Sequence, residues 1–162
     1  MGFLTGKTAI ITGAGRAVLK DGSCGSIGYG IATAYAKEGA NLVITGRNVK
    51  KLEAAKQELE SLYGIKVLTV QADVCAGGDN EATVANVVKQ AVDTFGGIQV
   101  LINNAQASAS GVPLAEHTTE QFDLAIYSGL YAAFYYMKAC YPYLAESHGL
   151  SLIHISAPTR RV

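Results

Sequence analysis

Apolar and polar positions follow two different periods along most of this chain. Short apolar runs rich in Val, Ile and Thr indicate strands that are buried on both faces. Longer segments, in which apolar residues recur every three or four positions, indicate amphipathic helices, and Gly follows several of them. The predicted strands are 8–12, 41–45, 66–71 and 98–102, and the predicted helices are 27–38, 49–63, 80–95 and a long helical region, 119–147, capped by Thr118 or Thr119.

This alternation of strands and helices predicts the fold class. Short strand–helix connections produce right-handed crossovers, and therefore a parallel sheet with helices on both faces. The expected architecture is α/β, a three-layer α/β/α, doubly wound sheet with strand order 3-2-1-4, or 3-2-1-4-5 if the last residues add a strand. No repeat or linker interrupts the pattern, so residues 1–149 are expected to form a single domain.

Composition and charge exclude several classes of protein. Thirteen basic and thirteen acidic residues cancel, so no strong field is expected to attract nucleic acid or an anionic membrane. The apolar stretches are too short to span a bilayer, and the N-terminus lacks the pattern of a secretory signal. Three widely spaced cysteines predict reduced thiols and a cytoplasmic location. No histidine has the spacing of a metal ligand, so no metal site is expected.

A glycine-containing turn connects the first predicted strand to the first predicted helix. Gly13 ends the strand and Gly28 lies at the helix start, with about nine more residues between them than a dinucleotide-binding turn needs. In such a turn backbone N–H groups approach a pyrophosphate, and the helix N-terminus adds partial positive charge. Glycines also serve as ordinary turn residues, so the motif is weak by itself. The candidate cofactor-binding residues here are Gly13, Arg16, Ser26, Ile27 and Gly28.

The end of the second predicted strand carries a candidate phosphate ligand. An acidic residue at this place would hydrogen-bond the ribose hydroxyls of NAD(H) and repel a 2′-phosphate. The chain instead has Gly46, which leaves room, followed by Arg47 and Asn48. The planar guanidinium of an arginine suits a phosphate. This pattern favours NADP(H) over NAD(H), and the alternative is that Arg47 is an ordinary solvated surface residue.

The third and fourth predicted strands also end in candidate cofactor-binding residues. Asp73 and Val74 follow the third strand, where a carboxylate could reach the adenine amino group. Asn103, Asn104 and Ala105 end the fourth strand. Two amides at a buried strand end need hydrogen-bond partners. A nicotinamide ribose and the neighbouring backbone would provide them.

These motifs, in this order, resemble the short-chain dehydrogenase/reductase family. The resemblance covers residues 5–149 and implies a Rossmann-like fold that binds NADP or NAD. It also implies hydride exchange between the cofactor and a small-molecule alcohol or ketone, and a homo-oligomer that pairs through the long helix 119–147. The matching motifs are Thr-Gly at 12–13, Thr-Gly-Arg at 45–47, Ala-Asp-Val at 72–74 and Asn-Asn-Ala at 103–105.

The chain also departs from the family pattern. Residues 26–32, Ser-Ile-Gly-Tyr-Gly-Ile-Ala, look more like the enoyl reductase branch, which therefore remains an alternative. Gln106 replaces the Gly that usually follows Asn-Asn-Ala. Gly129 occupies the position where many members carry a catalytic Asn, so that role does not transfer.

The catalytic pair that the resemblance implies is missing from the sequence. Carbonyl reduction requires a proton donor beside the developing alkoxide, and in this family a Tyr followed four residues later by a Lys provides it. No Tyr of this chain has a Lys four positions later, and Tyr135 and Lys138 are three apart. We therefore nominate no catalytic residue and expect a catalytically incomplete fragment of an oxidoreductase. The alternative is a non-catalytic dinucleotide-binding or sensor protein.

Residues 150–162 are expected to be a non-native tail. Leu150 to Arg160 resembles the translated adapter of sequencing libraries, from which only Ala157 departs. Aligned on the family's fifth strand, Ala157 also falls where a catalytic Ser is expected. The alternative is an incomplete fifth strand that belongs to the protein.

An aromatic stripe marks the long helical region. Tyr127, Tyr131 and Tyr135 are spaced at i, i+4 and i+8. One interpretation is a wall of the substrate pocket, and the favoured one is packing in the core or in a subunit interface. Without a covering partner this face would be exposed, and we expect poor solubility of the isolated chain.

Overall fold

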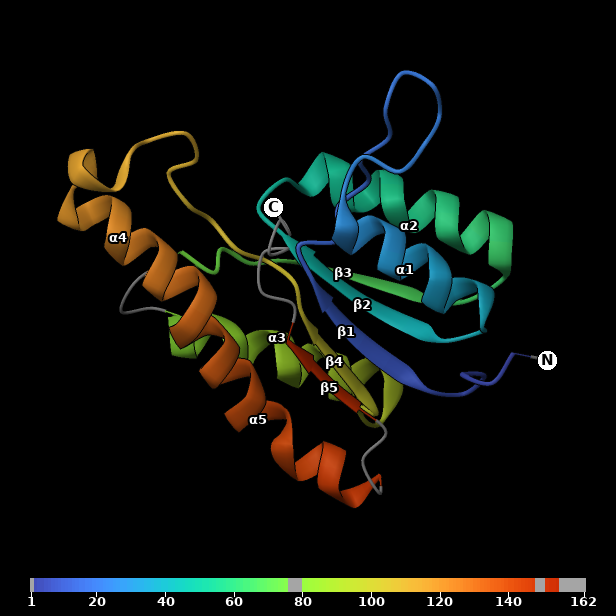
Figure 1. The fold of residues 1–162 in the computed structure, drawn as a ribbon. Helices are drawn as coiled ribbons and strands as arrows, with labels where there is room; N and C mark the ends of the chain where they lie inside the picture. The colour runs from blue at the N-terminus through green and yellow to red at the C-terminus, as the bar shows by residue number, and fades with distance from the viewer. Residues whose placement is uncertain (1, 76–79, 148–150, 155–162) are drawn as a thin grey trace.

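The structure, a computed structural model, describes residues 2–75, 80–147 and 151–154. All strands lie in one parallel sheet with the order β3-β2-β1-β4-β5 (Figure 1). The predicted fold class and strand order are confirmed, and a fifth strand is present next to β4. The strands are β1 (Thr8–Thr12), β2 (Asn41–Gly46), β3 (Val67–Gln71), β4 (Val100–Asn103) and β5 (Ser151–His154).

Two layers of helices cover the sheet. Helices α1 and α2 pack on one face, and helices α3 and α5 pack on the other (Figure 1). None of the described helices is long and apolar enough to cross a membrane. The helices are α1 (Ile27–Lys37), α2 (Val49–Tyr63), α3 (Asn80–Phe95), α4 (Thr119–Ile126) and α5 (Ala132–Glu146), with a short turn of 3₁₀ helix, η2, at Leu114–Glu116.

Strand β1 shows why the apolar run is continuous rather than alternating. Ile11 packs with the α1–α2 layer, whereas its neighbour Ile10 packs with the α3–α5 layer, and both are fully buried. Successive side chains of a strand point to opposite faces, so both faces need apolar residues when both are covered. Each such Ile contributes about 1.5–3 kcal/mol relative to an exposed side chain.

The exact ends of three strands differ from the prediction, since β2 also extends by one residue, to Gly46. Strand β4 begins at Val100 rather than at Ile98, because the side-chain oxygen of Gln99 accepts the hydrogen bond of the Thr8 N–H group at 2.7 Å. Strand β3 begins at Val67 rather than at Lys66. The backbone N–H group of Val67 donates to the Glu60 carboxylate at 2.9 Å instead of to another strand.

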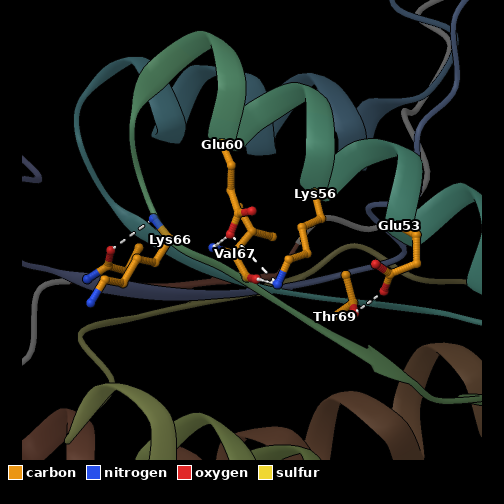
Figure 2. A network of polar contacts seen from close by, with 7 residues as sticks. Glu53, Lys56, Glu60, Lys66, Val67 and Thr69 are labelled. Atoms are coloured by element: carbon orange, nitrogen blue, oxygen red, sulfur yellow. Dashed lines mark hydrogen bonds and ion pairs between the residues drawn. The ribbon is translucent and has the colours of Figure 1, made fainter.

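The outer edge of β3 is covered by side chains of α2, as Figure 2 shows. Glu60 accepts from the Val67 N–H group, and Lys56 donates to the Val67 carbonyl at 2.9 Å. One turn earlier, Glu53 accepts from the Thr69 hydroxyl at 2.6 Å. An edge strand with unpaired polar groups is a template for aggregation, so these contacts protect the molecule on that side.

The long helical region is not one continuous helix, which corrects the prediction. It consists of α4, a π-helical segment η3 (Tyr127–Tyr131) and α5. Thr118 caps its start, with Gln121 returning the hydrogen bond in a capping box. In the π-helical segment the Ser128 hydroxyl donates to the Leu124 carbonyl at 2.7 Å. Such backbone contacts of a mid-helix Ser bend or interrupt a helix.

Tyr127, Tyr131 and Tyr135 form a chain of contacts on the surface of this region. The ring centroids of Tyr127 and Tyr131 lie 5.3 Å apart, and those of Tyr131 and Tyr135 lie 6.1 Å apart. Tyr131 is 43 % exposed, so core packing was the wrong interpretation for it. Tyr135 is partly buried and packs against the core, as the favoured interpretation expects, and the residue after it, Tyr136, lies inside the core. An interface between subunits remains a prediction for the stripe.

The predicted boundary between the domain, 1–149, and the tail, 150–162, remains a prediction. Ser151–His154 forms β5, which pairs in parallel with β4 from Val100 to Asn103. Residues 148–150 and 155–162, which include Ala157, lie outside the described residues.

Candidate functional site

The loops that follow the first four strands meet at the carboxyl edge of the sheet. The N–H groups of Gly13 and Ala14 donate to the Thr45 carbonyl at 2.9 and 3.1 Å, which fixes the loop after β1 to β2. The N–H group of Ala72 donates to the Gly46 carbonyl at 3.1 Å, which fixes the loop after β3 to β2 as well. This edge is where parallel α/β sheets bind ligands.

Asn104 and Thr12 connect the loop after β4 to the end of β1. The Thr12 hydroxyl oxygen accepts from the N–H groups of Asn104 and Ala105 at 3.0 and 2.9 Å. The Asn104 side-chain amide donates to the Thr12 carbonyl at 2.8 Å. Asn104 is therefore hydrogen-bonded largely to neighbouring backbone, which is one of the two partners predicted for the asparagine pair. The other partner, a nicotinamide ribose, stays a prediction.

The start of α1 packs unusually closely on the turn after β1. A Cβ atom added to Gly28 would lie 2.3 Å from the Gly13 carbonyl oxygen and 2.5 Å from Nδ2 of Asn104. Gly13 itself has φ 71°, a left-handed conformation that favours glycine. Both glycines are therefore needed to bring the N-terminus of α1 to the strand ends.

Three neighbouring cavities lie along this edge. The first, of about 250 Å³, is lined by Ser26, Arg47, Asn48 and Lys51 among others. The second, of about 200 Å³, shares Gly13, Gly46 and Arg47 with the first. The third, of about 320 Å³, shares Val74, Ala105 and Gln106 with the second. Because neighbouring cavities share walls, they form a row that an elongated ligand could occupy.

Most of the predicted cofactor-binding residues line this row, and four do not. The first cavity contains the predicted residues Gly13, Ser26, Arg47 and Asn48 in its lining. The second contains Gly13, Arg47, Val74, Asn104 and Ala105. The predicted residues that line none of the three cavities are Arg16, Ile27, Gly28 and Asp73.

Arg16 is instead paired within the protein. Its Nε atom donates to one oxygen of the Glu58 carboxylate, and the Tyr29 hydroxyl donates to the other at 2.6 Å. The hydrogen bond to Glu58 raises the pKa of Arg16. The hydrogen bonds from Tyr29 and then from Arg16 lower the pKa of Glu58. The Arg16 guanidinium therefore faces the Glu58 carboxylate of α2 rather than the cavities.

Lys51 is a candidate residue that the sequence analysis missed. It lines the first cavity with Arg47, and the first turn of α2 contains no acidic residue. Acidic residues are normally favoured at a helix N-terminus, and lysines are not. The pair Lys50-Lys51 directly after Arg47 and Asn48 was the available signal. No carboxylate lines this cavity.

The polar groups of the first cavity suit an anion. The Asn48 side chain caps α2 through its oxygen, which accepts from the Lys51 N–H group at 3.0 Å. Ser26 precedes α1, and its hydroxyl oxygen is shielded from solvent and has no partner among the described residues. A buried hydroxyl without a partner is costly. A phosphate oxygen would supply the missing partner.

Asp73 shapes the second cavity indirectly. Its carboxylate accepts from the Cys75 N–H group at 2.9 Å, which bends the chain so that Val74 and Cys75 line the cavity. Burial, followed by the charge of Asp73, raises the pKa of the Cys75 thiol. This thiol is therefore not activated as a nucleophile.

The third cavity contains a second buried polar group without a partner. Asn103 is only 6 % exposed, and its side-chain Nδ2 has no hydrogen-bond partner in the described part of the chain. Tyr136 also lines this cavity, and burial raises the pKa of its hydroxyl. No group of three His, Cys, Asp or Glu side chains suited to a metal ion occurs among the described residues.

Comparisons with known proteins identify the family. Residues 7–161 match the short chain dehydrogenase family. The chain belongs to this family. It is 60 % identical over 149 residues to the 12alpha-hydroxysteroid dehydrogenase of a Clostridium species, covering 92 % of this chain and 55 % of that protein. The chain therefore spans about half the length of this relative.

Solved structures support the same family. The L-sorbose reductase of Gluconobacter frateurii, determined with NADPH and L-sorbose, has a TM-score of 0.80 and 31 % identity, covering 95 % of this chain and 53 % of that one. A metagenomic short-chain oxidoreductase in complex with NADP has a TM-score of 0.82 and 26 % identity, covering 98 % and 66 %. The family assignment and the Rossmann-like fold follow from these matches, and both of these solved structures contain NADPH or NADP.

Proposed function

We propose that this chain is the cofactor-binding part of an NADP(H)-preferring oxidoreductase that interconverts a secondary alcohol and a ketone. The observation that carries the proposal is the row of three cavities with Arg47 and Lys51 at one end and no carboxylate beside them. A carboxylate there would select NAD(H) by repelling the 2′-phosphate. The two cations Arg47 and Lys51, together with the Asn48 amide, instead favour the 2′-phosphate and therefore NADP(H).

Each part of the row has a role in this proposal. Arg47 and Lys51 hold the 2′-phosphate, and the Ser26 hydroxyl and the N-terminus of α1 bind the pyrophosphate. The adenosine lies in the second cavity, which Arg47 also lines, and the other half of the cofactor extends toward the third cavity. When bound, the nicotinamide supplies or accepts the hydride. Arg16 has no direct part, because Glu58 holds it.

The relative of 60 % identity supports a substrate class. Its name places a hydroxysteroid among the substrates of that protein, and we propose a steroid secondary alcohol for the whole protein to which this chain belongs. The same relative favours alcohol–ketone chemistry over the enoyl reductase alternative. A turnover assay of the complete gene product with NADP⁺ and a 12α-hydroxysteroid tests this class. A failure to oxidise it would contradict the proposed substrate.

The chain by itself is proposed to bind cofactor without turnover. Tyr135 and Lys138 do not form the missing pair, because the Lys138 ammonium group donates to Glu81 at 2.7 Å. A Tyr and a Lys four residues apart in the complete gene product, together with turnover, would distinguish the enzyme from the non-catalytic sensor.

Titration of this chain with NADPH and with NADH tests the cofactor proposal. We expect saturable binding of NADPH, measured by the fluorescence of its nicotinamide. Arg47→Asp should weaken the binding of NADPH far more than the binding of NADH. Lys7→Asp is the control, since it makes the same charge change just before β1, at the opposite edge of the sheet. Equal weakening of both cofactors by Arg47→Asp would refute its assignment to the 2′-phosphate.

A further inference from the structure

Gln106 and Gly129 meet across the third cavity. Gln106 follows the Asn-Asn-Ala motif after β4, and Gly129 lies in the π-helical segment η3. A Cβ atom added to Gly129 would lie 3.5 Å from Nε2 of Gln106 and 3.8 Å from its Cδ. The Gln106 amide therefore occupies the space into which any longer side chain at residue 129 would extend.

A buried hydroxyl fixes these two residues relative to one another. Ser128 is 1 % exposed, and its oxygen accepts from the Ala107 N–H group at 2.9 Å. The same oxygen lies 3.0 Å from the Ala107 carbonyl and 2.7 Å from that of Leu124. Ala107 is adjacent to Gln106, and Ser128 is adjacent to Gly129. These contacts thus hold together the two backbone segments that carry Gln106 and Gly129.

Gln106 lies where the second cavity meets the third. It lines both cavities, whereas Arg47 lines the first and the second. A dinucleotide whose 2′-phosphate is held at Arg47 would therefore reach Gln106 with its other half. The third cavity also contains Asn103, whose buried Nδ2 has no partner in the described residues. Buried polar groups of this kind need a hydrogen-bond partner, which a bound cofactor could supply.

We propose that the Gln106 side chain binds the nicotinamide half of the cofactor at the junction of the second and third cavities. A carboxamide has both donors and an acceptor, and so can pair with ribose hydroxyls or with the carboxamide of the nicotinamide. Gly129 is a condition for this role, because it leaves the space that the Gln106 amide fills. This inference rests on the proposed function as an NADP(H)-binding chain.

The test moves the amide from one wall of the cavity to the other. In Gln106→Met the side chain keeps its length and loses its hydrogen bonds. The double variant Gln106→Gly/Gly129→Asn removes the amide at residue 106 and places an amide on residue 129 of η3 instead. The double variant Gln106→Gly/Gly129→Leu is its matched control, because Leu resembles Asn in shape and has no amide. Each variant is titrated with NADPH and with 2′,5′-ADP, which lacks the nicotinamide half.

We expect Gln106→Met to weaken NADPH by about 3- to 10-fold, the loss of one or two net hydrogen bonds. Binding of 2′,5′-ADP should stay unchanged, which a general structural defect would not allow. The Asn double variant should recover NADPH binding, and the Leu double variant should not. Thermal melts check folding, and Gln106→Ala, which only truncates an exposed side chain, replaces any variant that fails to fold.

Three results would overturn the inference alone: unchanged NADPH binding in Gln106→Met, equal weakening of NADPH and 2′,5′-ADP, or equal behaviour of the Asn and Leu double variants. If the unsubstituted chain shows no saturable NADPH binding, the proposed function fails and the inference fails with it. The first titration therefore separates the two failures.

Discussion

The Arg16 guanidinium and the Glu58 carboxylate form an ion pair that joins the first loop to α2. The Tyr29 hydroxyl, from α1, donates to the same carboxylate at 2.6 Å. Three segments therefore meet at one acidic side chain. The backbone confirms this arrangement, since the Arg16 N–H group donates to the Lys51 carbonyl at 2.8 Å. This contact holds the loop against the helix that carries Lys51.

The first prediction concerns stability in acid. The Tyr29 hydrogen bond and the Arg16 ion pair lower the pKa of Glu58, so the ionised carboxylate stabilises the fold. A depressed pKa gives stability that is present above the unfolded value and is lost as the pH falls through the folded value. Thermal melts should therefore show this contribution, below about 1 kcal/mol for a partly exposed pair, disappearing between about pH 5 and pH 3.

The variant Glu58→Gln isolates this contribution. Its melting temperature should fall less steeply with acid than that of the unsubstituted chain, while Glu116→Gln, on the exposed η2, should change nothing. Parallel curves for Glu58→Gln and the unsubstituted chain would show that the ion pair does not stabilise the fold.

The second prediction distinguishes two adjacent lysines. Lys51 lines the first cavity and Lys50 does not. Lys51→Gln should weaken NADPH by about 5-fold, because one cation near a phosphate is worth about 1 kcal/mol at an exposed site. NADH, which has no 2′-phosphate, should bind within about 2-fold of its original affinity. Isothermal titration measures both. The same loss from Lys50→Gln would mean that only the general charge of the α2 N-terminus matters.

Local signals predicted those parts of the fold that local contacts determine. Helix α2 was predicted to the residue because Asn48 caps its start and Gly64, with φ 65°, ends it. The start of β4 was missed because the Gln99 side chain replaces a backbone ladder partner of Thr8. No local pattern shows which hydrogen bonds a side chain will take over in this way.

The candidate site shows the same division. Arg47 was predicted to be near the cofactor from its place after a strand, which topology alone determines. The partner of Arg16 could not be predicted, since Glu58 is 42 residues away in sequence. The π-helical segment was missed because the Ser128 hydroxyl also contacts Ala107, 21 residues away in sequence, and no local pattern shows such a contact.

The third prediction concerns the close approach at Gly28. In Gly28→Ala the new Cβ would lie 2.3 Å from the Gly13 backbone oxygen, so the backbone must move. We expect a loss of about 2 kcal/mol, or roughly 4–8 °C in melting temperature. Gly46→Ala is the control, because its Cβ would lie 3.6 Å from a Leu52 side-chain carbon, an ordinary contact. Equal melting temperatures for Gly28→Ala and the unsubstituted chain would mean that α1 does not pack on the turn as described.

The fourth prediction concerns the aromatic face of α4, η3 and α5. Leu130, Tyr131 and Phe134 are 64, 43 and 51 % exposed and lie within four residues of one another, which makes a contiguous apolar surface rather than scattered positions. We propose that a second copy of the chain covers this face, as the family resemblance implies. Phe134→Glu should therefore lower the average mass in analytical ultracentrifugation, since a charge in an apolar interface is costly. Leu62→Glu, at an apolar residue of α2 that is 64 % exposed, should leave the mass unchanged. A monodisperse monomer before any substitution would exclude this interface, and equal effects of the two variants would show that association depends on general hydrophobicity instead.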